Sequence, residues 1–414
     1  MSRLYLDYAA TTPIDHRVAE SMAPFYFDEF GNASSVHQYG RDAAKAIDQA
    51  RVTIAKFLNA QFHEIIFTSG ATEGNNLAIQ GLVRKFRLKY TDRKLHIVTT
   101  SIEHSSVLQT CRDLESFGLA SVTYVNPEPN GIVLCEKILN AITDETVLVS
   151  VMMANNEVGT IQPIREIGKG IERINEQRIK AKTLGTDSSD MVLGKTSSVG
   201  SYDKVYFHTD AVQAGNYVPL NVLHLHVDLL TLSAHKIYGP KGVGSLYVKS
   251  GTPLVHIMGG GDQEYSLRPG TYNVPAIVGM GEACGLIERA FGHEGERLSK
   301  LRDLLIVELK KSIPRVRVNG DLVSRLPNNF NFAIPGLTGE SLMLRLDQEG
   351  FAVSTGSACS SGAVEVSHVL KAMGQSDREA GEAIRVTLGR STTEVEVLDF
   401  LKKLEYLSRV LKSN

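Results

Sequence analysis

The chain has 414 residues, of which 43% are hydrophobic and 22% are charged, and its formal net charge is −2. This is the composition of an ordinary soluble globular protein, and its length predicts two or three domains. The small net charge gives no reason to expect nucleic acid or a membrane as a partner. No apolar run approaches the roughly 20 residues that a membrane span needs.

The N-terminal segment and the cysteines indicate the cellular compartment of the protein. The chain reaches the apolar segment 4–6 almost at once, so we expect no signal or transit peptide. The cysteines show neither close pairs nor zinc spacing, which favours free thiols in a reducing compartment. They are Cys111, Cys135, Cys284 and Cys359. We therefore expect a cytoplasmic protein without a metal site.

Short apolar runs alternate with helical patterns from residue 64 to residue 248. The predicted strands are 65–68, 95–100, 121–125, 147–153, 205–208, 228–233 and 244–248. Strands that alternate with helices predict βαβ units, and hence an α/β fold with a mostly parallel sheet covered on both faces.

The pattern changes after Pro275. We predict a long helical stretch over about 278–312, which would link two domains. A smaller α+β domain follows, with strands at 316–318, 329–333 and 384–388 and helices near 339–349, 364–373 and 394–411. The predicted division is a large domain at 16–290 and a small domain formed by 1–15 and 291–414.

Lys236 is the most informative residue of the chain. It lies in the run SAHKIYGPKG (233–242), directly after the buried strand that 227–232 predicts. A lysine that emerges from a core at a strand end loses its proton readily and can form a Schiff base. The alternative is a surface lysine beside a turn. Three distant segments favour the first interpretation, since together they supply the groups that a pyridoxal phosphate ring requires.

Each of these segments follows a predicted strand. Asp210 comes after 204–208, where a carboxylate can keep the ring nitrogen protonated. The segment TSGATEGNN (68–76) offers hydroxyls and a helix N-terminus to a phosphate. His104 comes after 95–100, and its imidazole can stack on the ring and move protons near pH 7.

The motifs of these segments also resemble a known family when they are taken in order. They are SGATEGNNLAIQG, EHSSV, NNEVGTIQPI, HTDAVQ, SAHKIYGPKGVG, RPGT and STGSACSSG. The set is similar to the NifS/IscS type of cysteine desulfurase, which has the aspartate-aminotransferase-like fold (class V). The resemblance runs from residues 5–12 to residues 385–390. It implies pyridoxal 5′-phosphate as the cofactor.

The resemblance implies a role for each matching residue. Lys236 would hold the cofactor, Asp210 would partner the pyridine nitrogen, and His104 would stack on the ring. The other cofactor contacts would be Gln213 and Asn156 at the ring oxygen, Ala71, Thr72, Ser233 and His235 at the phosphate, and Thr271 at the phosphate of the neighbouring subunit. Arg385 would bind the substrate carboxylate, with Asn32 and Asn156 on the substrate side. Cys359 would be the nucleophile.

The implied reaction converts L-cysteine to L-alanine and leaves the sulfur on Cys359 as a persulfide. The implied working unit is a homodimer that passes the sulfur to an acceptor, either an iron–sulfur scaffold or a tRNA-thiolation protein. Two alternatives stay open, a selenocysteine lyase and a catalytically idle member that serves as a docking platform. The presence of Lys236, His104, Asp210 and Cys359 argues against the idle member.

One segment departs from the family pattern. A charged amphipathic helix is predicted from Ile164 to Lys182, and the following residues are rich in Ser, Gly, Thr and Asp. The family has a shorter connection here. We interpret 182–203 as an inserted mobile loop, with a partner-docking element as the alternative.

Overall fold

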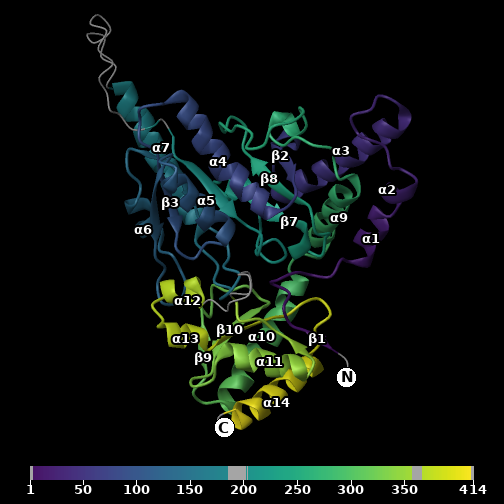
Figure 1. The fold of residues 1–414 in the computed structure, drawn as a ribbon, viewed down its shortest axis with the longest axis vertical. Coiled ribbons are helices and arrows are strands. Elements are labelled where there is room, and N and C mark those ends of the chain that lie inside the picture. The colour runs from purple at the N-terminus through teal and green to yellow at the C-terminus, as the bar shows by residue number, and fades with distance from the viewer. Residues whose placement is uncertain (1–2, 185–201, 203, 357–365, 412–414) are drawn as a thin grey trace, which may run out of the picture.

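A seven-stranded sheet lies at the centre of the larger part of the molecule (Figure 1). The structure is a computed structural model that describes residues 3–184, 202, 204–356 and 366–411. The strands are β2 (Ile65–Thr68), β3 (His96–Thr100), β4 (Ser121–Val125), β5 (Thr146–Ser150), β6 (Tyr206–Asp210), β7 (Leu229–Ser233) and β8 (Gly244–Val248). Their order is β2-β8-β7-β6-β5-β3-β4, and β8 runs in the direction opposite to the other six strands.

Helices cover both faces of this sheet. The helices of the larger part are α1 (His16–Met22), α2 (Pro24–Phe27), α3 (Gln38–Leu58), α4 (Ala71–Lys89), α5 (Ser105–Ser116), α6 (Cys135–Asn140), α7 (Ile164–Leu184), α8 (Val222–Leu225) and α9 (Val274–Ala290), of which α1 and α2 lie outside α9. Successive strand residues point to opposite faces. Phe67, Val98 and Leu230 accordingly pack with residues of α3 and α9, whereas Ile66, Ile97 and Leu229 pack with residues of α4 and α5.

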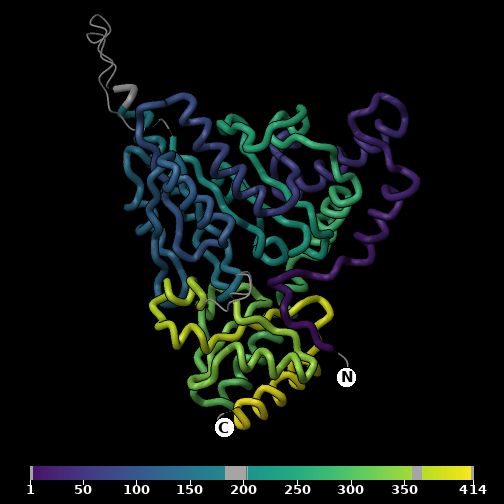
Figure 2. Tube along the Cα trace, in the orientation of Figure 1, coloured from purple at the N-terminus to yellow at the C-terminus, as the bar shows by residue number. Residues whose placement is uncertain are grey.

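A second, smaller assembly contains most of the C-terminal third of the chain. Its helices are α10 (His293–Ser312), α11 (Gly339–Gln348), α12 (His368–Ala372), α13 (Asp377–Gly381) and α14 (Glu394–Val410). Its strands are β9 (Arg317–Asn319), β10 (Asn329–Ala333) and β12 (Ala383–Thr387) in an antiparallel sheet. Leu6 joins its core, because β1 (Leu4–Tyr5) pairs in parallel with β11 (Phe351–Ala352). Figure 2 shows the N-terminal segment running down to this part.

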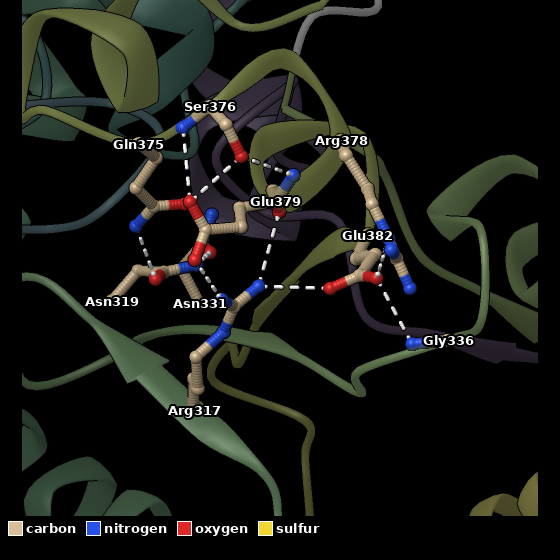
Figure 3. A network of polar contacts seen from close by, with 9 residues as sticks. All are labelled: Arg317, Asn319, Asn331, Gly336, Gln375, Ser376, Arg378, Glu379 and Glu382. Atoms are coloured by element: carbon tan, nitrogen blue, oxygen red, sulfur yellow. Dashed lines mark hydrogen bonds and ion pairs between the residues drawn. The ribbon is translucent and has the colours of Figure 1, made fainter.

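A polar network joins the smaller sheet to the segments around α13 (Figure 3), and one of its members also contacts the larger part. Arg317 on β9 donates to the carboxylates of Glu379 and Glu382 around α13. The Asn319 side chain donates to Asn331 Oδ1 at 2.7 Å, and Asn331 Nδ2 donates to the carbonyl of Glu157 at 3.1 Å. The segment that contains Asn156 is therefore held by side chains from β10.

The predicted α/β fold with its mostly parallel sheet is confirmed, and each strand predicted from 65 to 248 is present. The helical stretch predicted over about 278–312 is present as two helices, α9 and α10. The helical path of α9 ends at Phe291, whose ψ is 133°, and Gly292 with φ of 94° precedes α10. The helix predicted near 364–373 begins at His368, after a capping serine.

The domain boundaries at 16–290 and at 1–15 with 291–414 stay a prediction. The inserted loop predicted at 182–203 lies almost wholly outside the described residues, and α7 ends at Leu184. Among the described residues, no helix combines the length and the apolar character that crossing a membrane requires.

Candidate active site

Lys236 lies at the end of a short 3₁₀ turn (Ala234–Lys236) that follows β7 directly. Its ammonium group donates to the carbonyls of Ala9 at 2.6 Å and Ala10 at 2.7 Å, and its own carbonyl accepts from Asn216 at 2.7 Å. The side chain lines a pocket of about 570 Å³ at the carboxyl edge of the sheet. Lys236 is thus held at the boundary between the sheet and the N-terminal segment, with its amine facing the pocket.

The pocket gathers residues that are far apart in the sequence. Of the predicted site residues, its lining contains Ala71, Thr72, His104, Asn156, Asp210, Gln213, Ser233, His235, Lys236 and Arg385. The carboxyl ends of neighbouring parallel strands meet at one edge of a sheet, which explains why Asp210 on β6 and the residues after β7 converge there.

Asp210 is the last residue of β6 and is only 7% exposed. Its Oδ1 accepts from the backbone N–H of Val212 at 3.0 Å, and its Oδ2 accepts from Asn75 Nδ2 at 2.8 Å. Both hydrogen bonds fix the orientation of the carboxylate. A buried carboxylate at the floor of the pocket is the group that a protonated pyridine nitrogen requires.

The N-terminus of α4 forms one wall of the pocket. The helix begins at Ala71, and its N-cap residue Gly70, with φ of 154°, provides no side-chain cap. The first N–H groups of a helix have no partner within the helix, and they attract anions. Ser233 and His235 line the same wall. These donors fit a phosphate group.

His235 and His104 are both held in the neutral form. Burial lowers the pKa of His235 to about 4, and Lys236 and Lys241 act in the same direction. Burial also lowers the pKa of His104, although Asp210 opposes this change. His104 is the N-cap of α5, and its Nδ1 accepts from the Ser106 N–H at 3.1 Å. Its proton is therefore on Nε2.

Arg385 brings a guanidinium from the smaller assembly into the pocket. It lies on β12 and donates to Asp7 Oδ1 at 2.7 Å and to the carbonyl of Asn156 at 3.1 Å. Its Nε is buried and has no hydrogen-bond partner among the described residues. An unsatisfied buried N–H is costly, and a guanidinium with a free edge suits a carboxylate ligand.

Two predicted residues do not line the pocket of the single chain. Asn32 and Thr271 are both exposed. Cys359 lies outside the described residues. The three other cysteines are free thiols, and burial raises the pKa of Cys111 and of Cys284 to about 12 and also raises that of Cys135. Such thiols do not form reactive thiolates at neutral pH.

Other residues take part in the site without having been predicted. The carbonyls of Ala9 and Ala10 accept from Lys236, Asp7 pairs with Arg385, and Asn75 contacts Asp210. Asp7 and Asn75 lie inside motifs that the sequence displays, so their positions could be found from the motif. Their contacts could not, because each partner is more than 100 residues away in the chain.

The residues present therefore fit pyridoxal phosphate: a lysine, a buried carboxylate, a neutral imidazole and a helix N-terminus surround one pocket. With the parallel sheet, they define a pyridoxal-phosphate-dependent enzyme of the aspartate-aminotransferase-like fold. The aminotransferase class-V family model matches residues 4–180 and 192–400. The chain belongs to this family and to its NifS/IscS type.

Known proteins agree with this assignment over nearly the whole chain. The chain is 44% identical over 410 residues to a cysteine desulfurase IscS of Dictyoglomus turgidum, covering 99% of this chain and 95% of the relative. A solved NifS-like protein has a TM-score of 0.85 and 34% identity, with 99% and 100% coverage. The structure of SspA in complex with cysteine has a TM-score of 0.75 and 36% identity, with 93% and 98% coverage.

Proposed function

We propose that the protein is a pyridoxal-phosphate-dependent cysteine desulfurase that converts L-cysteine to L-alanine and takes the sulfur onto Cys359. One observation carries this proposal. A lysine amine and the Arg385 guanidinium, whose buried Nε has no partner in the part of the chain that the structure describes, line the same pocket, together with a buried carboxylate. This arrangement can bind the carboxylate of an α-amino acid while a base reaches its α carbon.

The cofactor would be held by groups on three sides. Lys236 would form the covalent link, Asp210 would bind the ring nitrogen, and His104 would lie against the ring. Gln213 and Asn156 would contact the ring oxygen, and Ala71, Thr72, Ser233 and His235 would bind the phosphate. When bound, pyridoxal phosphate supplies an electron sink for the electron pair that proton removal leaves on the α carbon.

The remaining roles in the reaction are assigned to residues of the protein. Arg385 binds the carboxylate of cysteine and fixes the amino acid at the pocket. Lys236, once released from its cofactor bond, removes the α proton, and the Ala9 and Ala10 carbonyls keep its amine at this place. His104, neutral and protonated on Nε2, can donate a hydrogen bond into the pocket without carrying a positive charge.

Cys359 receives the sulfur. Its thiolate attacks the sulfur atom of the bound cysteine, a sulfur–sulfur bond forms and the carbon–sulfur bond breaks. The carbon fragment gains protons and leaves as alanine. Since the described cysteines have raised pKa values, none of them competes well as a thiolate nucleophile.

The working unit that we propose is a homodimer. Asn32 and Thr271 are exposed and lie outside the pocket lining of one chain, so a partner subunit would bring them to a site. Large apolar side chains near Asn32 are also exposed and would be covered by the partner. They are Tyr26 (56%), Phe27 (79%), Phe30 (67%), Val36 (88%) and Tyr39 (56%).

The dimer is tested by light scattering on the wild type and on the double variant Phe27→Asp/Phe30→Asp. The wild type should have the mass of a dimer, and the charged variant should dissociate and bind pyridoxal phosphate more weakly. A fully active wild-type monomer would refute the shared site. The acceptor that we propose is an iron–sulfur scaffold or a tRNA-thiolation protein, in the cytoplasm.

The proposed reaction is tested by measuring alanine release from cysteine and from selenocysteine, with wild type and Cys359→Ala in parallel. A desulfurase requires Cys359 for cysteine, because the carbon–sulfur bond breaks poorly without a nucleophile on sulfur. Cys359→Ala should therefore release almost no alanine from cysteine. Multiple turnovers of cysteine by Cys359→Ala would overturn the mechanism. Activity on selenocysteine alone would identify a lyase, and no activity on either would indicate a docking protein.

A further inference from the structure

Asn75 is a wholly buried side chain one turn into α4, behind the pocket wall. It reaches the carboxyl edge of β6 because α4 lies very close to the sheet. A Cβ atom on the preceding Gly74 would stand 2.9 Å from Thr231 Cγ2, so only glycine permits this approach. Asn75 does not belong to the pocket lining. It can act on the site through the residues that it touches.

The amide nitrogen of Asn75 has two acceptors. Nδ2 lies 2.8 Å from Asp210 Oδ2 and 2.8 Å from Ser106 Oγ. An amide NH₂ group carries two hydrogens, so it can serve both. The orientation of the amide is fixed because Asp210 is an acceptor when ionised, and an amide oxygen turned toward it would be repelled.

Ser106 continues the chain of hydrogen bonds to His104. The Ser106 hydroxyl lies 2.9 Å from His104 Nδ1, which also accepts the Ser106 backbone N–H at 3.1 Å. Because Asn75 already donates to Ser106 Oγ, the hydroxyl hydrogen is available for Nδ1. Hydrogen bonds in a chain polarise one another at low dielectric. Asn75 therefore strengthens the donation that His104 receives.

We propose that Asn75 is a positioning residue that couples Asp210 to His104. One hydrogen of its amide orients and stabilises the Asp210 carboxylate, and the other acts through Ser106 on the imidazole. This inference rests on the proposed function, since it concerns the carboxylate and the imidazole assigned to the cofactor ring. Through these hydrogen bonds the buried Asn75 amide acts both on the carboxylate assigned to the ring nitrogen and on the imidazole assigned to the face of the ring.

The direction of the effect follows from proton affinity. Removal of the Asn75 side chain takes away the donor that stabilises negative charge on Asp210 Oδ2. The proton shared between Asp210 and the pyridine nitrogen then moves toward Asp210. The ring becomes a weaker electron sink, so kcat should fall about ten- to hundredfold, the range of one hydrogen bond to a charged group. The KM for cysteine should change by less than about threefold, because Arg385 is untouched.

The test records solid-state ¹⁵N spectra of the holoenzyme with ¹⁵N-labelled pyridoxal phosphate and ¹⁵N-labelled histidine. His104 is assigned from the signals that His104→Gln lacks. In Asn75→Ala the pyridine nitrogen should move toward the neutral-pyridine position, and His104 Nδ1 should move toward the position of a less hydrogen-bonded nitrogen. In Ser106→Ala only the His104 signal should move.

Asn76→Ala is the matched control. Asn76 has the same side chain on the same helix, but it contacts the backbone carbonyl of Thr72 and the side chains of Gln80 and Thr110, and no hydrogen bond links it to Asp210 or Ser106 among the described residues. Neither signal should move in this variant. If Asn75→Ala does not bind the cofactor, Asn75→Asp replaces it. A protonated carboxyl has one hydrogen for two acceptors, so at least one of the two signals must still move.

An unchanged pyridine signal in a cofactor-loaded Asn75 variant would overturn the proposal. Movement of the pyridine signal without the His104 signal would remove the coupling and contradict the proposal as stated. Both signals are recorded without turnover. They therefore remain informative if the protein proves to act on selenocysteine, or on neither substrate, which are the failures of the proposed function.

Discussion

Two layers of ionisable groups lie at the carboxyl edge of the large sheet, and they have opposite properties. The layer inside the protein is neutral. Burial lowers the pKa of His208 to about 3 and raises the pKa of Glu103 to about 8. His208 is hydrogen-bonded to Ser150 at 2.8 Å and to Thr231 at 3.0 Å.

The layer that faces the pocket holds the charges. Asp210, Lys236 and Arg385 lie on the pocket wall, and each makes hydrogen bonds to the backbone that fix its position. Burial therefore keeps the ionisable groups inside the protein uncharged, whereas the groups on the pocket wall carry the charge. The electrostatic field in the pocket is then set by a few charged side chains, and each of them can be replaced separately.

Replacement of Lys236 should have the largest effect. Lys236→Ala removes both the covalent link to the cofactor and the base at the α carbon, so alanine release should fall by about a thousandfold or more. Alanine is measured by amino-acid analysis, with the cofactor content checked by absorbance. Turnover near wild type would show that another residue holds the cofactor.

Replacement of Asp210 tests the role of the carboxylate at the floor of the pocket. Asp210→Asn keeps the shape but loses the negative charge, so the ring nitrogen loses its proton and kcat should fall about a hundredfold or more. Cofactor affinity should fall much less, since the phosphate wall is intact. The two quantities are measured by steady-state kinetics and by fluorescence titration. A loss of cofactor binding equal to the loss of kcat would contradict the assigned role.

Replacement of Arg385 tests the contribution of the smaller assembly to substrate binding. Arg385→Lys keeps the charge but cannot present two parallel N–H groups, so KM for cysteine should rise about tenfold. Steady-state kinetics checks this, and Lys403→Arg on the outer helix α14 is a control that should leave KM unchanged. If KM stays constant while kcat falls, Arg385 acts on the chemical step and does not hold the substrate.

The interior layer should affect stability more than rate. His208 is neutral when folded but takes up a proton below pH 6.5 when unfolded. Its contribution to stability is therefore complete above pH 6.5 and is lost as the pH falls toward 3. Between pH 6.5 and pH 5 the loss is about 2 kcal/mol. In urea unfolding, His208→Gln should reduce the difference between these two pH values. An unchanged difference would mean that His208 is protonated in the folded protein.

The smallest effect is expected from residues 185–201, the segment between the end of α7 and Tyr202. Its composition offers few residues for a core, and loop-closure entropy depends only weakly on the number of residues. Replacement of residues 185–201 by a short glycine–serine linker should leave alanine release within about twofold of wild type. A large loss with the fold intact would show that the segment helps to build the site.

The sequence predicted the sheet edge better than the rest of the site. Strands such as 65–68 and 244–248 are short apolar runs between turns, and buried strands of a sheet covered on both faces have this pattern. Asp210 and Lys236 stand directly after such strands, so their meeting could be predicted from the rule that parallel strands end at one edge.

The parts that escaped prediction depend on distant contacts. The parallel pairing of Leu4–Tyr5 with Phe351–Ala352 involves two-residue strands without any local signal. It determines where Asp7, Ala9 and Ala10 lie, and hence the partners of Arg385 and Lys236. The break at Gly292 was missed because the helical pattern continues on both sides of it.

The central claim is that Cys359 accepts sulfur at the pocket that holds Lys236, Asp210 and Arg385. The most direct measurement is peptide mass spectrometry of the holoenzyme after brief exposure to L-cysteine, with persulfides trapped by alkylation. The account predicts one added sulfur atom on the peptide that contains Cys359, and none when Lys236→Ala is treated in the same way. Added sulfur only on Cys111, Cys135 or Cys284, or none on any peptide while alanine is released, would contradict it.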